Sequence, residues 1–279
     1  LYIGKSKNIR DRVLSHFSSD IHNSKEMNIS QQIKHISTMV TAGELGALLL
    51  ESRLIKEKLP LYNRQLRLKQ QLTGLFLKSD EAGYNTLTTR SVSSVSPEEL
   101  YVFSGSSISQ TEEKIVGFFR SVKQAKEYLS VIAVEHHLCE KMLGLEKTTS
   151  ACFGYRLERC KGACLGEELA LKYNMRLTQA LSDIKIKPWP FMGPIMIEEV
   201  NELAGKKEYF LLDKWCYLGN AISDTEGLVH QELHNLQFDL DIYKIIKRYL
   251  ATPSNIKNIK NIPAHTFTAM NTPELGAMI

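Results

Sequence analysis

Residues 1–17 read LYIGKSKNIRDRVLSHF, and this stretch decides how the first part of the chain is interpreted. Tyr2 to Gly4 predicts the end of a strand that runs into a turn. After the turn, Ile9, Val13 and Phe17 recur at the spacing of an α-helix. A strand, a turn and a helix are therefore expected in succession at the start of the chain.

Arg12 and His16 are four residues apart, which places them on one face of that helix and away from its apolar stripe. Residues 33–40 alternate weakly and predict a short strand. A second helix is expected from Glu44 to Leu59, where Pro60 ends it. Its predicted buried face consists of Leu45, Leu48, Leu49, Ser52 and Ile55. These elements predict a small α/β unit, with a central sheet flanked by helices, that ends near residue 67.

The middle of the chain predicts a hairpin followed by helices. Residues 72–77 and 100–103 are expected to be its strands, on either side of a loop rich in Ser and Thr at 86–96. Residues 118–143 and 167–184 are dominated by helix-favouring residues. A helical region is therefore expected after the hairpin.

Beyond a Pro-Trp-Pro segment at 188–190, residues 194–200 and 208–218 predict strands, and 239–250 fits either a helix or a strand. From Thr252 onward the chain has little to bury and is predicted to be disordered. The predicted fold class is therefore α/β (α+β). Four parts are expected: residues 1–70, 71–185, 186–250 and a tail at 251–279.

The charge of the 279-residue chain is uneven, although the net charge is only +4. From Leu1 to Leu77 basic residues outnumber acidic residues by about two to one, and the remainder is slightly acidic. A basic first quarter suits a polyanionic partner such as nucleic acid. At this charge alone, a solvated basic surface is the commoner explanation.

Cysteine usage and hydropathy point to the cytoplasm. Five cysteines in a chain that shows no secretory signal favour reduced thiols over a disulfide framework. No apolar run approaches the roughly 18 residues of a membrane span. A cytoplasmic protein without membrane attachment is expected.

The first sixty residues contain the side chains that phosphodiester hydrolysis needs. Glu51 is a hard oxygen ligand for Mg²⁺ or Mn²⁺, which often takes only one or two protein carboxylates. Arg12 offers a planar fork to a phosphate, and Lys5 a mobile charge. Taken singly, each is more often structural, and Glu51 could instead pair with Lys56 or Lys58.

In their order along the chain, these residues resemble a family. The segment Tyr2-Ile3-Gly4-Lys5, then Arg12, then Glu51, then Pro60-Leu61-Tyr62-Asn63 is similar to the second half of the GIY-YIG nuclease domain of UvrC-like excinucleases, above all the short Cho type. The resemblance covers nearly everything except the tail. The first motif of the family, a strand with its own tyrosine upstream of Tyr2, has no counterpart in a sequence that starts at Leu1, so a truncated first strand is expected.

The resemblance implies roles for individual residues. Tyr2 would orient or activate the attacking water, Arg12 would hold the scissile phosphate, and Glu51 would bind a single Mg²⁺ or Mn²⁺. Lys5 and Asn63 occupy further active-site positions, and His16 could carry a proton. The residues expected to contact DNA are Lys5, Lys7, Arg10, Lys56 and Arg64.

Four cysteines, Cys139, Cys152, Cys160 and Cys164, lie within twenty-six residues. Four thiolates bind either zinc or an iron–sulfur cluster. Structural zinc sites usually pair ligands two to four residues apart, and only Cys160 and Cys164 are so close. The resemblance implies a [4Fe-4S] cluster, with Zn²⁺ as the alternative. The fifth cysteine, Cys216, is expected to be a small buried side chain.

The leading hypothesis is a metal-dependent DNA endonuclease of nucleotide excision repair that makes one incision 3′ to a lesion. The resemblance implies damaged double-stranded DNA and a UvrB-like damage-recognition protein as partners, a monomeric state and a place in the SOS response. One alternative is the carboxy-terminal part of a fusion with a 3′-5′ exonuclease like the epsilon subunit of DNA polymerase III. A second alternative is a catalytically inactive DNA-binding module held together by the cysteines.

Overall fold

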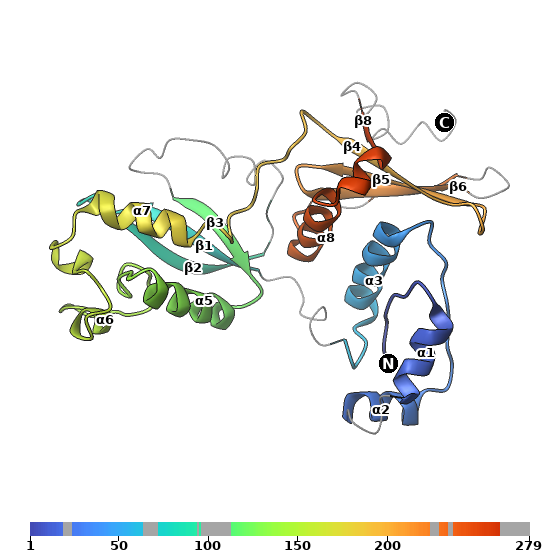
Figure 1. Ribbon diagram of the computed structural model, residues 1–279, viewed down its shortest axis with the longest axis horizontal. Coiled ribbons are helices and arrows are strands. Elements are labelled where there is room, and N and C mark those ends of the chain that lie inside the picture. The colour runs from blue at the N-terminus through green and yellow to red at the C-terminus, as the bar shows by residue number, and fades with distance from the viewer. Residues whose placement is uncertain are drawn as a thin grey trace. The chain divides into compact units, whose positions relative to one another are not determined.

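The structure is a computed structural model that describes residues 1–18, 24–63, 72–93, 95, 113–223, 229–233 and 237–262, with only the backbone described at 229–233. The chain forms two compact units (Figure 1). One combines Leu1–Lys69 with Trp189–Ile279, and the other is Gln70–Pro188. Each unit pairs helices with an antiparallel sheet, which confirms the predicted α/β (α+β) class. Whether the four predicted parts are separate domains stays a prediction.

The first unit begins with three helices, α1 (Ile9–Ser18), α2 (Ser24–Gln32) and α3 (Glu44–Lys58). The Oδ1 atom of Asn8 caps α1 by accepting a hydrogen bond from the backbone amide of Asp11 at 3.3 Å. Helices α1 and α3 were predicted, whereas α2 was not. Helix α1 packs against α2.

The buried side of α1 differs from its apolar stripe. Ile9 and Phe17 remain exposed, and His16 is the buried residue of the helix. In α3 four of the five predicted core residues are buried, and Leu48 is only partly buried. Helical spacing therefore identified both helices, but only the α3 stripe is a core face.

The two strands predicted in the first forty residues are wrong. Residues 2–4 have no strand partner among the described residues, because the backbone of Ile3 is bonded to a side chain instead. The Asn63 Oδ1 atom accepts from the Ile3 amide at 2.9 Å, and its Nδ2 donates to the Ile3 carbonyl at 2.7 Å. Residues 33–40 are exposed almost throughout and are not a strand, since a weakly alternating segment has no buried face to set a register.

The sheet of the first unit comes from the other end of the chain. Its strands are β4 (Ile195–Asn201), β5 (Lys206–Asp213), β6 (Cys216–Ser223), β7 (Val229–Leu233) and β8 (Ile259–Asn261). They are antiparallel and ordered β7-β6-β5-β4-β8.

The strand predicted over 194–200 is confirmed, but the one predicted over 208–218 is two strands. Lys214 and Trp215 have φ values of 45° and 66° and form the turn between β5 and β6.

The segment 253–261 was predicted to be disordered and instead forms a short 3-10 helix, Pro253–Asn258, and strand β8. Residues 263–279 lie outside the described residues.

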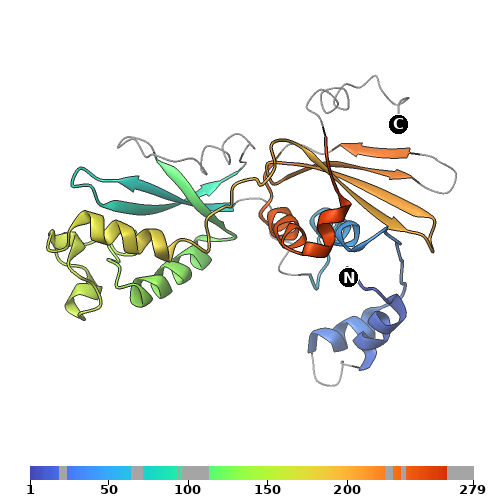
Figure 2. The ribbon, with the colours of Figure 1, turned by 45° about the horizontal axis from the view of Figure 1, so that its top comes forward.

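Helix α8 (Leu240–Leu250) lies beside α3 on one side of this sheet (Figure 1 and Figure 2). The Oδ1 atom of Asp239 caps it by accepting hydrogen bonds from the amides of Asp241 and Ile242, at 2.8 and 3.1 Å. This cap explains why an ambiguous segment is a helix. None of the described helices combines the length and apolar character needed to cross a membrane.

The second unit is built on strands β1 (Leu72–Ser79), β2 (Asn85–Val92) and β3 (Lys114–Phe119), in the order β2-β1-β3. The hairpin partner of β1 is β2, so the loop predicted at 86–96 is wrong over residues 86–92. The predicted partner at 100–103 lies outside the described residues.

Helices α5 (Val122–Glu135) and α7 (Ala170–Ala180) cover one face of that sheet (Figure 2). The helix predicted over 118–143 is shorter, because Phe118 belongs to β3 and Ser121 caps α5 by accepting from the Gln124 amide. Between α5 and α7 the chain has only short pieces, α6 (Phe153–Arg156) and a 3-10 turn at 163–165.

Two buried glutamates lie directly opposite each other on β4 and β5. Glu199 is 7% exposed, Glu208 is 4% exposed, and both side chains contact the start of α3. Burial raises the pKa of Glu208 above its ordinary value of 4.5, although the Ala42 amide and the Lys206 charge oppose the change. The folded protein therefore binds this proton more tightly than the unfolded chain does.

We expect Glu208→Gln to remove part of the pH dependence of stability. A carboxyl group with a raised folded-state pKa contributes stability below pH 4.5 that is lost as pH rises through the folded pKa. The free energy of unfolding should consequently fall less with rising pH in Glu208→Gln than in the wild type. Urea denaturation at several pH values measures this, with Glu198→Gln as the control. Parallel curves for Glu208→Gln and the wild type would contradict the prediction.

Candidate functional site

The Tyr2 ring lies directly over the backbone of Gly4. A Cβ atom on residue 4 would lie 2.7 Å from the Tyr2 hydroxyl oxygen and 2.8 Å from ring atom Cε1. A side chain at position 4 would therefore displace the Tyr2 ring. Because Asn63 holds both polar backbone groups of Ile3, it fixes the segment between Tyr2 and Gly4. Asn63, predicted at the active site, thus contacts the backbone that carries Tyr2.

Arg12 is bonded to Tyr2. Its Nη2 atom donates to the Tyr2 hydroxyl at 2.6 Å, which joins the start of the chain to α1. Lys25 of α2 lies over the same ring, with its Nζ atom 5.1 Å from the ring centroid. The phenol is therefore flanked by two cations.

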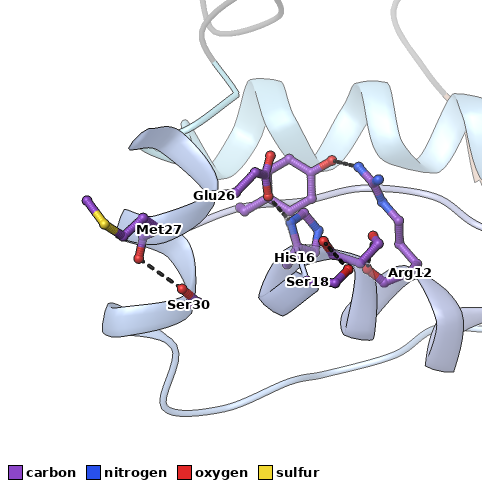
Figure 3. Close-up of polar contacts among 8 residues, drawn as sticks. Arg12, His16, Ser18, Glu26, Met27 and Ser30 are labelled. Carbon is purple, nitrogen blue, oxygen red and sulfur yellow. Dashed lines mark hydrogen bonds and ion pairs between the residues drawn. The ribbon is translucent and has the colours of Figure 1, made fainter. Parts of the chain in front are cut away.

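The His16 ring packs against the Tyr2 ring. The two rings meet edge to face, with centroids 4.9 Å apart and planes at 69°. The Nδ1 atom of His16 contacts a carboxylate oxygen of Glu26 from α2 (Figure 3). Glu26 therefore sets the orientation of the imidazole. Sequence reasoning missed Glu26 because it did not predict α2.

Glu51 extends from α3 toward the same group of residues and is half-buried. Burial raises the pKa of its carboxyl group above 4.5, while the charge and backbone amide of Lys5 and the charge of Arg12 act in the opposite direction. Both cations are thus close enough to influence Glu51. The structure therefore brings Tyr2, Lys5, Arg12, His16 and Glu51 close together. Their catalytic roles stay a prediction.

Lys5 also contacts the start of α3. Its Nζ atom lies 3.0 Å from Oε1 of Glu44. The pKa of Glu44 is lowered, first by this hydrogen bond and the Lys5 charge, and also by the charges of Lys7 and Arg248. Arg248 belongs to α8, and its place near the site had no local signal in the sequence.

Apart from Lys5, which contacts Glu44, the residues predicted to contact DNA fall into three groups. Lys7 and Arg10 are exposed on the segment that carries the site. Lys56 instead pairs with Asp239 and lies 3.7 Å from Asp241, so it joins α3 to α8. Arg64 lies outside the described residues.

The four predicted cysteines meet in the second unit. The sulfur atoms of Cys139, Cys152 and Cys164 lie within 4.8 Å of one another. The Cys160 thiol is hydrogen-bonded to Cys139 and Cys152. Three of the four are buried, and Cys164 is partly exposed. Cys216 is buried in β6, in the other unit, as expected for a small core side chain.

The cluster is polarised by hydrogen bonds. The bond from Cys139 lowers the pKa of Cys160, and backbone amides of Gly162 and Ala163 contribute. The same bond and burial raise the pKa of Cys139. The Cys152 sulfur accepts from the Tyr155 amide at 3.4 Å. Backbone amides aimed at sulfur stabilise thiolate charge, as metal ligation requires.

The surroundings fit a metal centre bound by sulfur. Tyr173 is completely buried, and its hydroxyl has no hydrogen-bond partner among the described residues. Burial is the main cause that raises its pKa, so the hydroxyl stays protonated and can donate. Cys139 and Cys160 are close enough to contribute to that shift. Zn²⁺ and an iron–sulfur cluster both agree with four thiolates here.

Comparison with known families identifies three successive segments. Residues 1–64 match the UvrC-like GIY-YIG domain, residues 92–183 the middle domain of UvrC/Cho excinucleases, and residues 194–265 the Excinuclease Cho C-terminal domain. The helices and strands around Tyr2, Arg12 and Glu51 thus fall in the first and third segments, and the cysteines in the second.

Curated relatives cover most of the chain. Excinuclease cho of Salmonella typhimurium is 35% identical over 249 residues, which is 88% of this chain and 76% of the relative. Excinuclease cho of Escherichia coli K12 is 36% identical over 250 residues, with the same coverage. UvrABC system protein C of Psychrobacter arcticus is 25% identical over 271 residues, or 93% of this chain and 40% of that protein. No solved structure gives a significant match.

The cysteine cluster should hold a metal in the protein purified anaerobically. We expect Cys152→Ala to lose that metal and to lower the melting temperature, because three thiolates cannot close a four-ligand site. Metal analysis and thermal unfolding measure both effects. Cys216→Ala is the matched control and should keep its metal. Equal metal content in Cys152→Ala and the wild type would disprove the assignment.

Proposed function

We propose that this chain, which belongs to the Cho family of UvrC-like GIY-YIG excinucleases, cuts one strand of damaged DNA in nucleotide excision repair. The cut lies 3′ to the lesion. The chain is a nuclease of this family. The observation that supports the site is the convergence of Tyr2, Arg12 and Glu51 within residues 1–64.

Arg12 binds the scissile phosphate in this proposal. A guanidinium group has five N–H donors, and the hydrogen bond to Tyr2 uses one of them. The remaining donors can hold two phosphate oxygens in a bidentate arrangement. Lys7 and Arg10 are exposed beside it and bind neighbouring phosphates.

Tyr2 orients the attacking water. Its oxygen accepts the hydrogen bond from Arg12, so the hydroxyl hydrogen and a second lone pair remain for a water molecule. The packing of His16 and Gly4 around the ring holds the hydroxyl in place. His16, whose Nδ1 is engaged by Glu26, supports the phenol through ring packing.

Glu51 holds Mg²⁺ or Mn²⁺. Burial disfavours its bare negative charge, and a bound cation removes that cost. When bound, the cation would polarise the phosphate and make a water molecule more acidic. Lys5, bonded to Glu44, keeps a positive charge beside the carboxylate and balances charge that develops on the phosphate.

The second unit supplies a cysteine-bound metal centre, for which we propose a [4Fe-4S] cluster with Zn²⁺ as the alternative. A UvrB-like damage-recognition protein presents the lesion, the enzyme works as a monomer in the cytoplasm, and its synthesis belongs to the SOS response. The similarity to the Excinuclease cho and UvrABC system protein C relatives supports the UvrB-like partner. The cluster type, the monomeric state, the cytoplasm and the SOS response are implications of the family resemblance.

Glu51→Ala should abolish nicking and leave DNA binding within about twofold, because the cation ligand is lost while the phosphate-binding cations remain. The assay is Mg²⁺-dependent nicking of a lesion-containing duplex by the full-length protein, with and without damage-loading proteins. Glu57→Ala, an exposed glutamate on the same helix, is the matched control. Binding without any nick by the wild type would favour an inactive DNA-binding module.

Tyr2→Phe should slow nicking by about 10²-fold, because the hydroxyl that orients the attacking water is lost. The ring and its packing against His16 are retained and only the exposed bond with Arg12 is lost, so the melting temperature should change little. Single-turnover kinetics measure the rate. Tyr62→Phe, which removes a hydroxyl bonded to Gln32 at 3.1 Å, is the control. A wild-type rate for Tyr2→Phe would remove the phenol from the mechanism.

A further inference from the structure

Helix α3, which carries Glu51, begins at a residue that cannot cap it. Gly43 occupies the N-cap position and provides no side-chain hydrogen bond. The first amides of a helix have no partner within the helix and must find one elsewhere. Here the amides of Leu45 and Gly46 donate to Oε1 and Oε2 of Glu199, both at 2.9 Å. A residue of β4 thus caps α3.

The start of α3 is shaped to receive this carboxylate. A Cβ atom on Gly43 would lie 2.3 Å from the carboxyl carbon of Glu199, and one on Gly46 would lie 2.3 Å from Oε2 of Glu208. Gly43 has an extended backbone, φ −160°, that any residue adopts. Space for the glutamates, and not backbone conformation, therefore requires these glycines.

Burying Glu199 and Glu208 beside each other would cost free energy if the start of α3 did not compensate for it. Glu199 and Glu208 are opposite each other on adjacent strands, where like charges repel, and both are buried. The positive end of the α3 dipole, and the amides of Leu45 and Gly46 that donate to Glu199, offset that repulsion. Lys206 of β5 contributes as well, since its Nζ lies 3.7 Å from Glu208 and 2.7 Å from the Val40 carbonyl oxygen.

The far end of α3 is also held by the carboxy-terminal segment, through Lys56 with Asp239 and Asp241. Glu51 lies between these two attachments. It is six residues beyond Leu45, or about 9 Å along the axis at 1.5 Å per residue. Because a helix is stiff, a shift at its first turn moves Glu51 relative to Arg12 and Tyr2.

We propose that Glu199 is a positioning residue for the nuclease site. By capping α3 it sets where Glu51 and Glu44 lie relative to Tyr2, Lys5 and Arg12. The segment that matches the Cho carboxy-terminal domain is thus part of the catalytic apparatus. This inference rests on the proposed nuclease function.

The test compares Glu199→Ala, Glu199→Gln and Glu198→Gln in the full-length protein. Glu198 is the neighbouring residue on β4 and pairs with Lys260 on β8, so it controls for charge loss on the same strand. Single-turnover nicking gives a rate constant and an amplitude. Partial unfolding lowers the amplitude, whereas a displaced Glu51 lowers the rate constant.

We expect the rate constant of Glu199→Ala to fall about 10- to 100-fold, as for residues that orient a metal ligand, with DNA affinity within about twofold. Glu199→Gln keeps a carbonyl acceptor for one amide and should recover part of the rate. Glu198→Gln should match the wild type. A wild-type rate constant for Glu199→Ala, or a loss confined to the amplitude, would overturn the inference.

Mn²⁺ binding separates this inference from the proposed function. We expect Glu199→Ala to weaken Mn²⁺ affinity about tenfold, measured by electron paramagnetic resonance without DNA. If the wild type makes no nick, the proposed function fails and Mn²⁺ affinity alone decides the inference. Equal affinity in both proteins, or no Mn²⁺ binding by the wild type, would overturn it. Should Glu199→Ala fail to fold, Glu199→Gln is judged by the same measurements.

Discussion

A helix must satisfy the amides of its first turn, and in α3 this requirement is met by Glu199, more than 150 residues further along the chain. The cap explains several features together: two buried glutamates opposite each other, glycines at 43 and 46, and a sheet made of residues 195–261 against a helix from the first sixty. This contact joins the two ends of the chain together with the packing of α3 against α8 and the ion pairs of Lys56.

The site itself depends on close approaches of side chains to backbone. Gly4 lets the Tyr2 ring lie against the chain, and Asn63 holds Ile3 by both of its polar groups. Arg12 and His16, one turn apart on α1, then contact the Tyr2 hydroxyl and pack edge to face with the Tyr2 ring, respectively. A phenol fixed from three directions presents its oxygen at a defined place, which is what the positioning of a reacting water requires.

In the second unit, the feature that matters is the irregular stretch that contains the four cysteines. Between α5 and α7 the chain has only a four-residue helix and a three-residue turn as regular structure, and turn hydrogen bonds hold much of the rest of its backbone. The cysteines lie in this irregular stretch, and their sulfur atoms accept hydrogen bonds from its backbone amides. A metal bound there would replace the missing secondary structure as the element that holds the stretch together.

The sequence by itself determined the helices α1 and α3, the grouping of the cysteines and the α/β class, because residue order and helical spacing are local properties. It predicted the site residues as a set, and the structure shows them near one another. It could not show which strands pair, since the partner of β1 and the sheet beneath α3 depend on contacts far apart in the chain. Only the tertiary structure revealed Glu26 behind His16, Lys56 bound to Asp239, and Glu199 at the start of α3. Each of these contacts joins polar groups from different parts of the chain, and a polar group removed from water can be understood only once its partner is in place.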